Sequence, residues 1–88
     1  MDWDKQTQEK FKSMVNKMPI FHRHIAEAAV VKKAEANAVL RKAPKVAEAD
    51  VIAGFFSEVP KTFYSLMIRL LDNSGFDYKK YGFPKNIE

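Results

Sequence analysis

Four prolines divide this chain, and apolar residues recur at helical spacing in the intervals between them. In the first interval the i, i+3, i+4, i+7 pattern of one helix face is formed by Phe11, Met14, Val15 and Met18. Pro19 lacks an amide proton and disfavours a helical conformation at the residue before it, so this helix must stop there. The pattern predicts a helix over residues 4–16, with Asp2 or Asp4 as its N-cap.

The second interval runs from about Pro19 to Arg41 and is rich in alanine, the strongest helix former. At about 100° per residue, one side of this helix gathers the apolar residues Phe21, Ile25, Ala28, Val31, Ala38 and Val39. Val30 and Ala34 lie toward another side. A helix that is apolar on more than one face is usually central, and small alanines let a neighbouring helix approach closely. We therefore predict that this helix is the spine of the fold and that it ends before Pro44.

A short extended link at Val46 should lead into a third helix, because Glu48 and Asp50 fall in a first turn, where the helix dipole favours negative charge. The apolar stripe of this helix is Val51, Ile52, Phe55, Phe56 and Val59. Gly54 weakens it by about 1 kcal/mol unless a neighbour packs against the glycine. Pro60 starts or kinks a fourth helix. The expected buried residues of that helix are Phe63, Leu66, Met67, Leu70 and Leu71.

After a helix stop at Gly75, the chain ends in an aromatic and basic tail. The tail residues are Tyr78, Tyr81 and Phe83 with Lys79, Lys80 and Lys85. Such residues can stack on bases or dock a partner, but folding back over the core is their commoner role. The predicted fold is therefore all-α, a compact bundle of about four helices with a short extended link before the third helix and an aromatic C-terminal tail. It forms a single domain over residues 1–88, of which 60–88 hold the fourth helix and the tail.

Composition limits the function classes. A chain of 88 residues supports one core, and its 47% apolar content and mixed charges are typical of a globular domain. The absence of cysteine excludes disulfides, thiolate zinc sites and a catalytic thiolate. No stretch approaches the roughly 20 apolar residues that cross a bilayer, and the first residues do not resemble a secretory signal. We expect a cytoplasmic protein without a membrane partner.

No residue pattern points to catalysis or to a metal. His22 and His24 are two positions apart and lie on different helix faces, whereas helical zinc ligands are four apart. Glu35 falls within the apolar stripe of the second helix, and a buried carboxylate needs a cation or amide donors, so a structural ion pair is favoured over a functional acid. The serines and threonines lack a strained nucleophile turn, and the glycines are scattered. We predict no catalytic residue, no metal site and no cofactor.

A candidate basic surface surrounds the end of the second helix, formed by Lys32, Lys33, Arg41, Lys42 and Lys45. The net charge is +4 and the isoelectric point about 9.4. Such a surface can neutralise phosphates in a salt-dependent and largely sequence-independent way. More often it is a solvated helix end that complements the helix dipole.

Short motifs along the first two thirds of the chain share a pattern with one known family. They are Trp3, residues 17–23 (KMPIFHR), Glu35, Ala38 and Val46. Over about residues 3–56 the chain resembles the small domain at the C-terminus of a light-independent protochlorophyllide reductase component. The resemblance implies a compact helical domain in which Arg23 and Glu35 form a structural ion pair. It implies no reductase activity, because the clusters and substrate pocket of that enzyme belong to other domains.

These observations favour a non-enzymatic helical interaction or accessory module, with an unidentified protein partner. The resemblance suggests a partner in a reductase or tetrapyrrole-related system. The alternative is a basic nucleic-acid-binding protein, since a long helix, the link at Val46 and a following helix are similar to half of a histone fold. Dimerisation is expected if part of the apolar stripe on the third or fourth helix stays exposed.

Overall fold

The helices form where the apolar spacing and the prolines place them. The computed structural model describes residues 1–84, so Lys85 lies outside the described residues. In chain order the elements are β1 (Asp2–Trp3), α1 (Lys5–Asn16), α2 (Ile20–Leu40), β2 (Lys45–Val46), α3 (Glu48–Glu58), the 3₁₀ helix η1 (Lys61–Phe63), α4 (Tyr64–Asn73) and the 3₁₀ helix η2 (Tyr78–Tyr81). Among residues 1–84 there are four α-helices, and the predicted small all-α bundle is confirmed.

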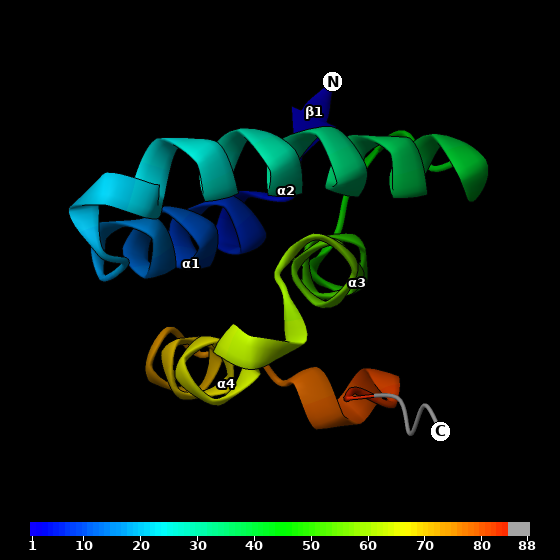
Figure 1. Ribbon diagram of the computed structural model, residues 1–88. Helices are drawn as coiled ribbons and strands as arrows, with labels where there is room; N and C mark the ends of the chain where they lie inside the picture. The colour runs from blue at the N-terminus through cyan, green and yellow to red at the C-terminus, as the bar shows by residue number, and fades with distance from the viewer. Residues whose placement is uncertain (85–88) are drawn as a thin grey trace.

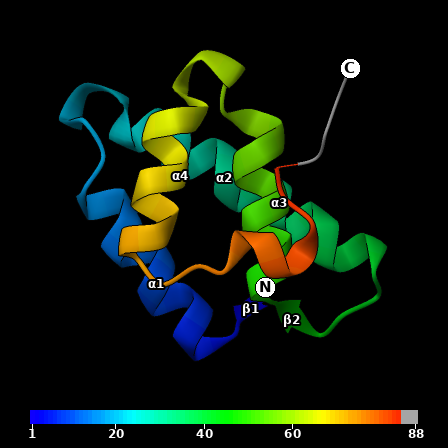
Figure 2. The same cartoon turned by 90° about the horizontal axis from the view of Figure 1, so that it is seen from below.

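The long helix α2 is the spine of the bundle. It runs across the molecule in Figure 1, with α3 and α4 seen nearly end-on beneath it and α1 along its first half. From below, α3 and α4 both cross in front of α2 (Figure 2). The most extensive packing of α2 is against α3. The prediction that α2 is the spine of the fold is therefore confirmed by this packing.

The contact between α2 and α3 is made through small residues. A Cβ atom placed at Gly54 of α3 would lie 3.3 Å from the carbonyl oxygen of Val30 and 3.5 Å from the amide nitrogen of Ala34. Val30, Ala34 and Ala38 are fully buried, and they follow one another at i, i+4 and i+8 along one side of α2. Gly54 thus lets the two helix backbones approach closely, as the sequence allowed.

The expectation that both apolar sides of α2 are covered is wrong. Of the stripe that begins at Phe21, Ala38 is buried, but Phe21, Ile25 and Val39 are exposed, with Phe21 89% accessible to solvent. The face with Val30 and Ala34 is inside instead, because α3 can come close only to a side that carries small residues. A helix with apolar residues on two sides has buried one of them and left the other in water.

The fourth helix also differs from the prediction. Pro60 is followed by the 3₁₀ turn η1, and α4 starts only at Tyr64. Met67, Leu70 and Leu71 are buried as expected. Phe63 and Leu66 are instead 51% and 39% exposed. They fall on a side of η1 and α4 that the other elements of residues 1–84 leave partly open to solvent.

The chain start is tied to the link after α2. Asp4 caps α1, since its Oδ2 accepts hydrogen bonds from the amide and hydroxyl of Thr7 at 3.0 and 2.9 Å. The two-residue strands β1 and β2 pair in parallel, with Trp3 opposite Val46. The amide of Asp4 continues the pairing by donating to the Val46 carbonyl at 2.8 Å. The extended link was predicted, but its partner strand was not.

The end of α2 is closed by a paired hydrogen-bond motif. The amide of Ala43 donates to the Ala38 carbonyl and the amide of Lys42 to the Val39 carbonyl, both at 2.9 Å. Lys42 adopts the left-handed conformation that this motif requires, with φ of 60°. Pro44 follows and prevents the helix from continuing.

The aromatic tail folds back over the bundle. Phe76 and Tyr78 are buried, and the ring of Phe83 stacks on Phe56 of α3 at 5.0 Å between centroids. The hydroxyl of Tyr64 donates to the Phe56 carbonyl on the same side of α3. The predicted packing of the tail is confirmed for the described residues.

The close approach at Gly54 predicts a large effect of added volume. Gly54→Leu should lower the free energy of unfolding by about 1–3 kcal/mol, despite the better helix propensity of leucine, because the added side chain separates α3 from α2. Ala36→Leu, on the exposed side of α2, is the control and should leave stability unchanged within about 0.5 kcal/mol. Urea denaturation followed by circular dichroism measures both. A Gly54→Leu protein as stable as the wild type would contradict the role given to this contact.

Candidate functional site

Two proline corners face each other across an opening in the bundle. Pro19 separates α1 from α2, and Pro60 separates α3 from η1. The chain turns at both places, and the first half of α2 and the η1–α4 segment stand on opposite sides of the opening. The result is an apolar groove of about 290 Å³, lined by Met14, Met18, Pro19, His22, Ile25, Ala26, Ala29, Val30, Phe55, Glu58, Val59, Pro60, Phe63, Leu66, Met67 and Leu70.

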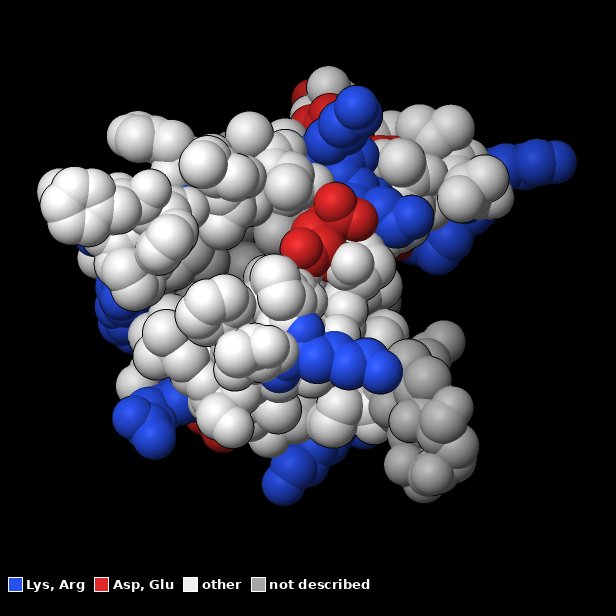
Figure 3. Space-filling model, in the orientation of Figure 1, with Lys and Arg blue, Asp and Glu red and all other residues white. Residues whose placement is uncertain are grey.

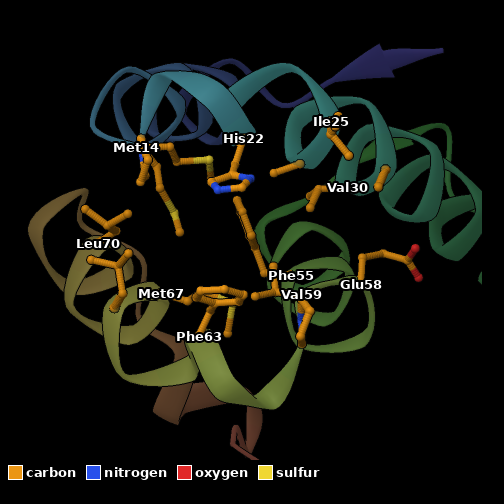
Figure 4. A pocket seen from close by; sticks show the side chains of 16 residues that line it. Met14, His22, Ile25, Val30, Phe55, Glu58, Val59, Phe63, Met67 and Leu70 are labelled. Atoms are coloured by element: carbon orange, nitrogen blue, oxygen red, sulfur yellow. The ribbon is translucent and has the colours of Figure 1, made fainter.

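The floor of the groove is the hydrophobic core itself. Phe55 of α3 rises from below, while Met14 and Met67 approach from α1 and α4 (Figure 4). All three side chains are buried in the bundle. Methionine is unbranched and flexible, so these walls can adjust to the shape of an apolar group. The groove can therefore adapt where Met14 and Met67 border it.

The rim of the groove is apolar as well as exposed. Ile25 of α2 is 74% accessible, and Phe63 of η1 and Leu66 of α4 stand on the opposite side. The rings of His22 and Phe63 face each other across the mouth, with centroids 6.5 Å apart. Figure 3 shows a broad uncharged surface over the first half of α2 and over α4, with a hollow between them. Large apolar side chains in water beside a cavity are typical of a binding site.

Arg23 holds the corner from which the groove opens. Its Nη2 atom donates to the carbonyl oxygens of Asn16 and Met18, at 2.9 and 3.0 Å. These carbonyls belong to the end of α1 and the turn before Pro19. Arg23 thereby fixes the direction in which α2 leaves α1, and so the position of one groove wall.

The structure does not pair Arg23 with Glu35. The two residues lie twelve positions apart on one straight helix, which separates them by about 18 Å. Glu35 instead accepts a hydrogen bond from the indole Nε1 of Trp3 at 3.1 Å. The strand pairing of β1 with β2 brings Trp3 beside α2, and that pairing could not be read from helical spacing. Glu35 therefore anchors the N-terminal segment.

The candidate basic surface is partly used within the fold. The guanidinium of Arg41 binds the carboxylate of Asp50 in α3 through two hydrogen bonds, at 2.9 and 2.6 Å. Lys32, Lys42 and Lys45 are exposed, and Lys33 is half-buried. Four lysines of the predicted surface thus face solvent to some degree, whereas its arginine stabilises the contact between α2 and α3.

Asp50 has a structural role at the start of α3. It is buried, and its Oδ2 also accepts from the Ala47 amide at 2.9 Å, so it caps the helix as well as binding Arg41. Burial raises the pKa of Asp50, but the hydrogen bonds from Arg41 and Ala47 outweigh burial and leave the pKa below its usual value. The same contact raises the pKa of Arg41. Asp50 therefore stays ionised in the folded protein at neutral pH.

A second ion pair joins α1, α3 and the tail. The Nζ atom of Lys10 lies 2.7 Å from Glu48 Oε1. The other oxygen of Glu48 accepts from the backbone amide of Asp77 at 3.1 Å. Glu48, which was expected to complement the dipole of α3, thus also attaches the tail to the bundle.

The groove offers packing surface for an apolar group. His22 and Glu58 are its charged or titratable lining residues, and both are exposed at its edge. His24 is exposed on another side of α2. Within residues 1–84 no three histidine or acidic residues lie close enough together to hold a metal ion. Across the same residues, no helix has the length and apolar character needed to cross a membrane.

Sequence reasoning missed the groove because it assigned Phe63 and Leu66 to the buried face of the fourth helix and expected the second helix to be covered on both of its apolar sides. The sequence did contain a signal for an adaptable apolar surface. Met14, Met18 and Met67 have flexible side chains, and the first two of them precede the proline corner at Pro19. What the sequence does not contain is the angle at which each helix leaves its proline.

These features define a small all-α domain with an open apolar groove between two proline corners. The chain belongs to the family described as Protein of unknown function (DUF2621), whose sequence profile matches residues 1–83. No curated protein and no solved structure matches the sequence significantly. The resemblance to the protochlorophyllide reductase domain is therefore wrong: the family match covers nearly the whole chain, including the fourth helix and most of the tail, and it points elsewhere. The reductase or tetrapyrrole-related partner suggested by that resemblance is withdrawn with it.

The lowered pKa of Asp50 predicts acid sensitivity. A carboxyl whose pKa is lower in the folded than in the unfolded protein adds stability above its unfolded pKa of about 3.9, and that stability is lost as the pH falls through the folded value. Asp50→Asn should lower the free energy of unfolding by about 1–3 kcal/mol at neutral pH, with a smaller deficit near pH 2. The exposed Asp72→Asn is the control. Urea denaturation at several pH values measures this; a deficit independent of pH would contradict it.

Proposed function

We propose that this protein is a non-enzymatic interaction module whose groove binds the apolar face of a helix from a partner protein. The observation that carries the proposal is the combination of a 290 Å³ apolar groove with the exposed large side chains of Ile25, Phe63 and Leu66 on its rim. Exposing such side chains in a monomer leaves favourable burial unused. A partner that covers them gains that free energy on binding.

A helix fits the shape of the groove better than an extended segment does. The walls are themselves helical, α2 on one side and η1 with α4 on the other, and an amphipathic helix can lie over both of them with the side chains of its apolar stripe directed into the groove. No sheet edge borders the groove, since the residues that line it come from helices and the turns between them. Met14, Met18 and Met67 give this surface the adaptability that helix-binding grooves use.

Methionine methyl groups provide a direct test. Three of the four methionines line the groove, while Met1 lies in the N-terminal segment and serves as an internal control. Titration with an amphipathic peptide of leucine, glutamine and lysine should shift the methyl NMR signals of Met14, Met18 and Met67, but not that of Met1. A scrambled peptide of equal composition should shift none of them. Equal shifts with both peptides, or shifts at Met1 alone, would argue against the groove as a helix-binding site.

A matched pair of leucines tests the same site by mutation. Leu66→Glu places a charge on the rim and should weaken peptide binding at least about tenfold, because the carboxylate loses water when the groove is covered. Leu40 is 80% exposed at the C-terminal end of α2, away from the groove. The Leu40→Glu variant should therefore bind the peptide as the wild type does. Isothermal titration measures both affinities. Equal affinities for the two variants would place the peptide elsewhere.

A second candidate function is nucleic-acid binding through the basic end of α2. It is supported by the exposed Lys32, Lys42 and Lys45 and by the succession of α2, β2 and α3. The first candidate has stronger support, because Arg41, the residue best suited to grip a phosphate, is already bound to Asp50.

Fluorescence anisotropy tests the second candidate. With duplex DNA, single-stranded DNA and RNA, micromolar binding that weakens steeply with salt is expected if the basic end of α2 is an interface. The double variant Lys42→Glu/Lys45→Glu should abolish it, whereas Lys61→Glu in η1 should have little effect. Binding that does not respond to salt, or no binding, would exclude this function.

A further inference from the structure

The exposed face of α2 and the groove lie side by side on the same helix. Phe21 and Ile25 are one turn apart on the exposed face, and Ile25 also forms part of the groove rim. A protruding aromatic ring, 89% accessible, therefore stands next to an open cavity. A protrusion beside a cavity is self-complementary. When two copies are related by a two-fold axis, the ring of each copy can enter the cavity of the other.

The dimensions of the two features agree. A cavity of about 150 Å³ is enough to hold benzene in a protein core. The groove encloses about 290 Å³, so it has room for a phenylalanine ring together with part of a neighbouring aliphatic side chain. Its lining is apolar except for His22 and Glu58, which are exposed at the edge and can keep contact with water.

The exposed apolar area also matches what a dimer needs. Ile20, Phe21, Ile25, Phe63 and Leu66 are each between 39% and 89% accessible. Together they expose on the order of 500 Å² of apolar surface. A standard interface buries about 800 Å² on each partner, of which about 65% is apolar in homodimers, or about 520 Å².

A lipid bilayer fits the same surface less well than a second copy does. Its smooth surface would cover the protruding side chains but would leave the cavity unfilled.

From this we infer that the occupant of the groove is Phe21 of a second copy of the chain, inserted reciprocally in a two-fold symmetric homodimer. This inference rests on the proposed function, for which it names the partner. In the dimer each α2 contributes both the inserted ring and one wall of the cavity that receives its counterpart. The groove is incomplete in a single copy.

The first experiment is sedimentation equilibrium on the full chain. The wild type should dimerise, and Phe21→Ala should raise the dimer dissociation constant about 100-fold, which is about tenfold for each of the two insertions. Leu40→Ala, an equally exposed change at the other end of α2, should have little effect. Because Phe21 is exposed in the single copy, its loss should leave the helical circular dichroism of the monomer unchanged.

The second experiment tests reciprocity by complementation. Phe21→Lys removes the inserted ring and Leu66→Glu damages the cavity rim, so each variant alone should be monomeric. A mixture should recover association, because the intact Phe21 of the Leu66→Glu chain can enter the intact groove of the Phe21→Lys chain, while the second contact brings opposite charges together. A mixture that stays monomeric would overturn reciprocal insertion.

Failure of the dimer and failure of the proposed function give different results. A wild type that is monomeric in the millimolar range but binds the amphipathic peptide would overturn the homodimer and leave a helix-binding groove. A monomer that binds no peptide would overturn both. Dimerisation unaffected by Phe21→Ala would place the interface elsewhere. A monomer that cosediments with phosphatidylglycerol vesicles through Phe21 would replace the second copy with a lipid surface.

Discussion

The close approach of α3 to α2 at Gly54 determines the rest of the structure. A side chain at this position would meet the backbone of Val30 within 3.3 Å, so a glycine is what allows the two helices to pack along the small residues of α2. Polar contacts then fix the other end of the same interface: Asn37 donates to the Asp50 carbonyl at 3.1 Å, and Arg41 binds the Asp50 carboxylate. The inward face of α2 is thereby chosen by backbone proximity rather than by the size of its apolar side chains.

This choice explains where the unused apolar surface lies. Once the small residues face α3, the large side chains of Phe21 and Ile25 must point elsewhere, because a helix carries its faces at fixed angles. In the second half of α2, α3 and the strand β2 pack against one side of the helix. At the first half the groove opens between α2 and the η1–α4 segment, next to the exposed ring of Phe21. Groove and exposed face are therefore two consequences of one packing arrangement.

Much of the fold could be predicted from the sequence, whereas the site could not. Helix positions follow from apolar spacing and from Pro19, Pro44 and Pro60, since both signals act within a few residues. The sequence did not indicate which apolar side of α2 would be buried, because nothing local reveals that Gly54 will meet Val30. The partner of Glu35 was equally out of reach, because Trp3 arrives beside α2 only through the pairing of β1 with β2. Such long-range contacts leave no periodic trace in the sequence.

The distribution of polar and apolar side chains argues for function through association. The charged residues Arg23, Glu35, Arg41 and Asp50 all serve contacts within the fold. Three large apolar residues of the predicted helix faces, Phe21, Ile25 and Phe63, face solvent instead. Burial of such surface is driven mainly by release of water and depends little on direction, so specificity must come from shape. A protruding ring beside a cavity of matching size supplies that shape. The groove, rather than the charged surface, is therefore the better candidate for the binding site of this domain.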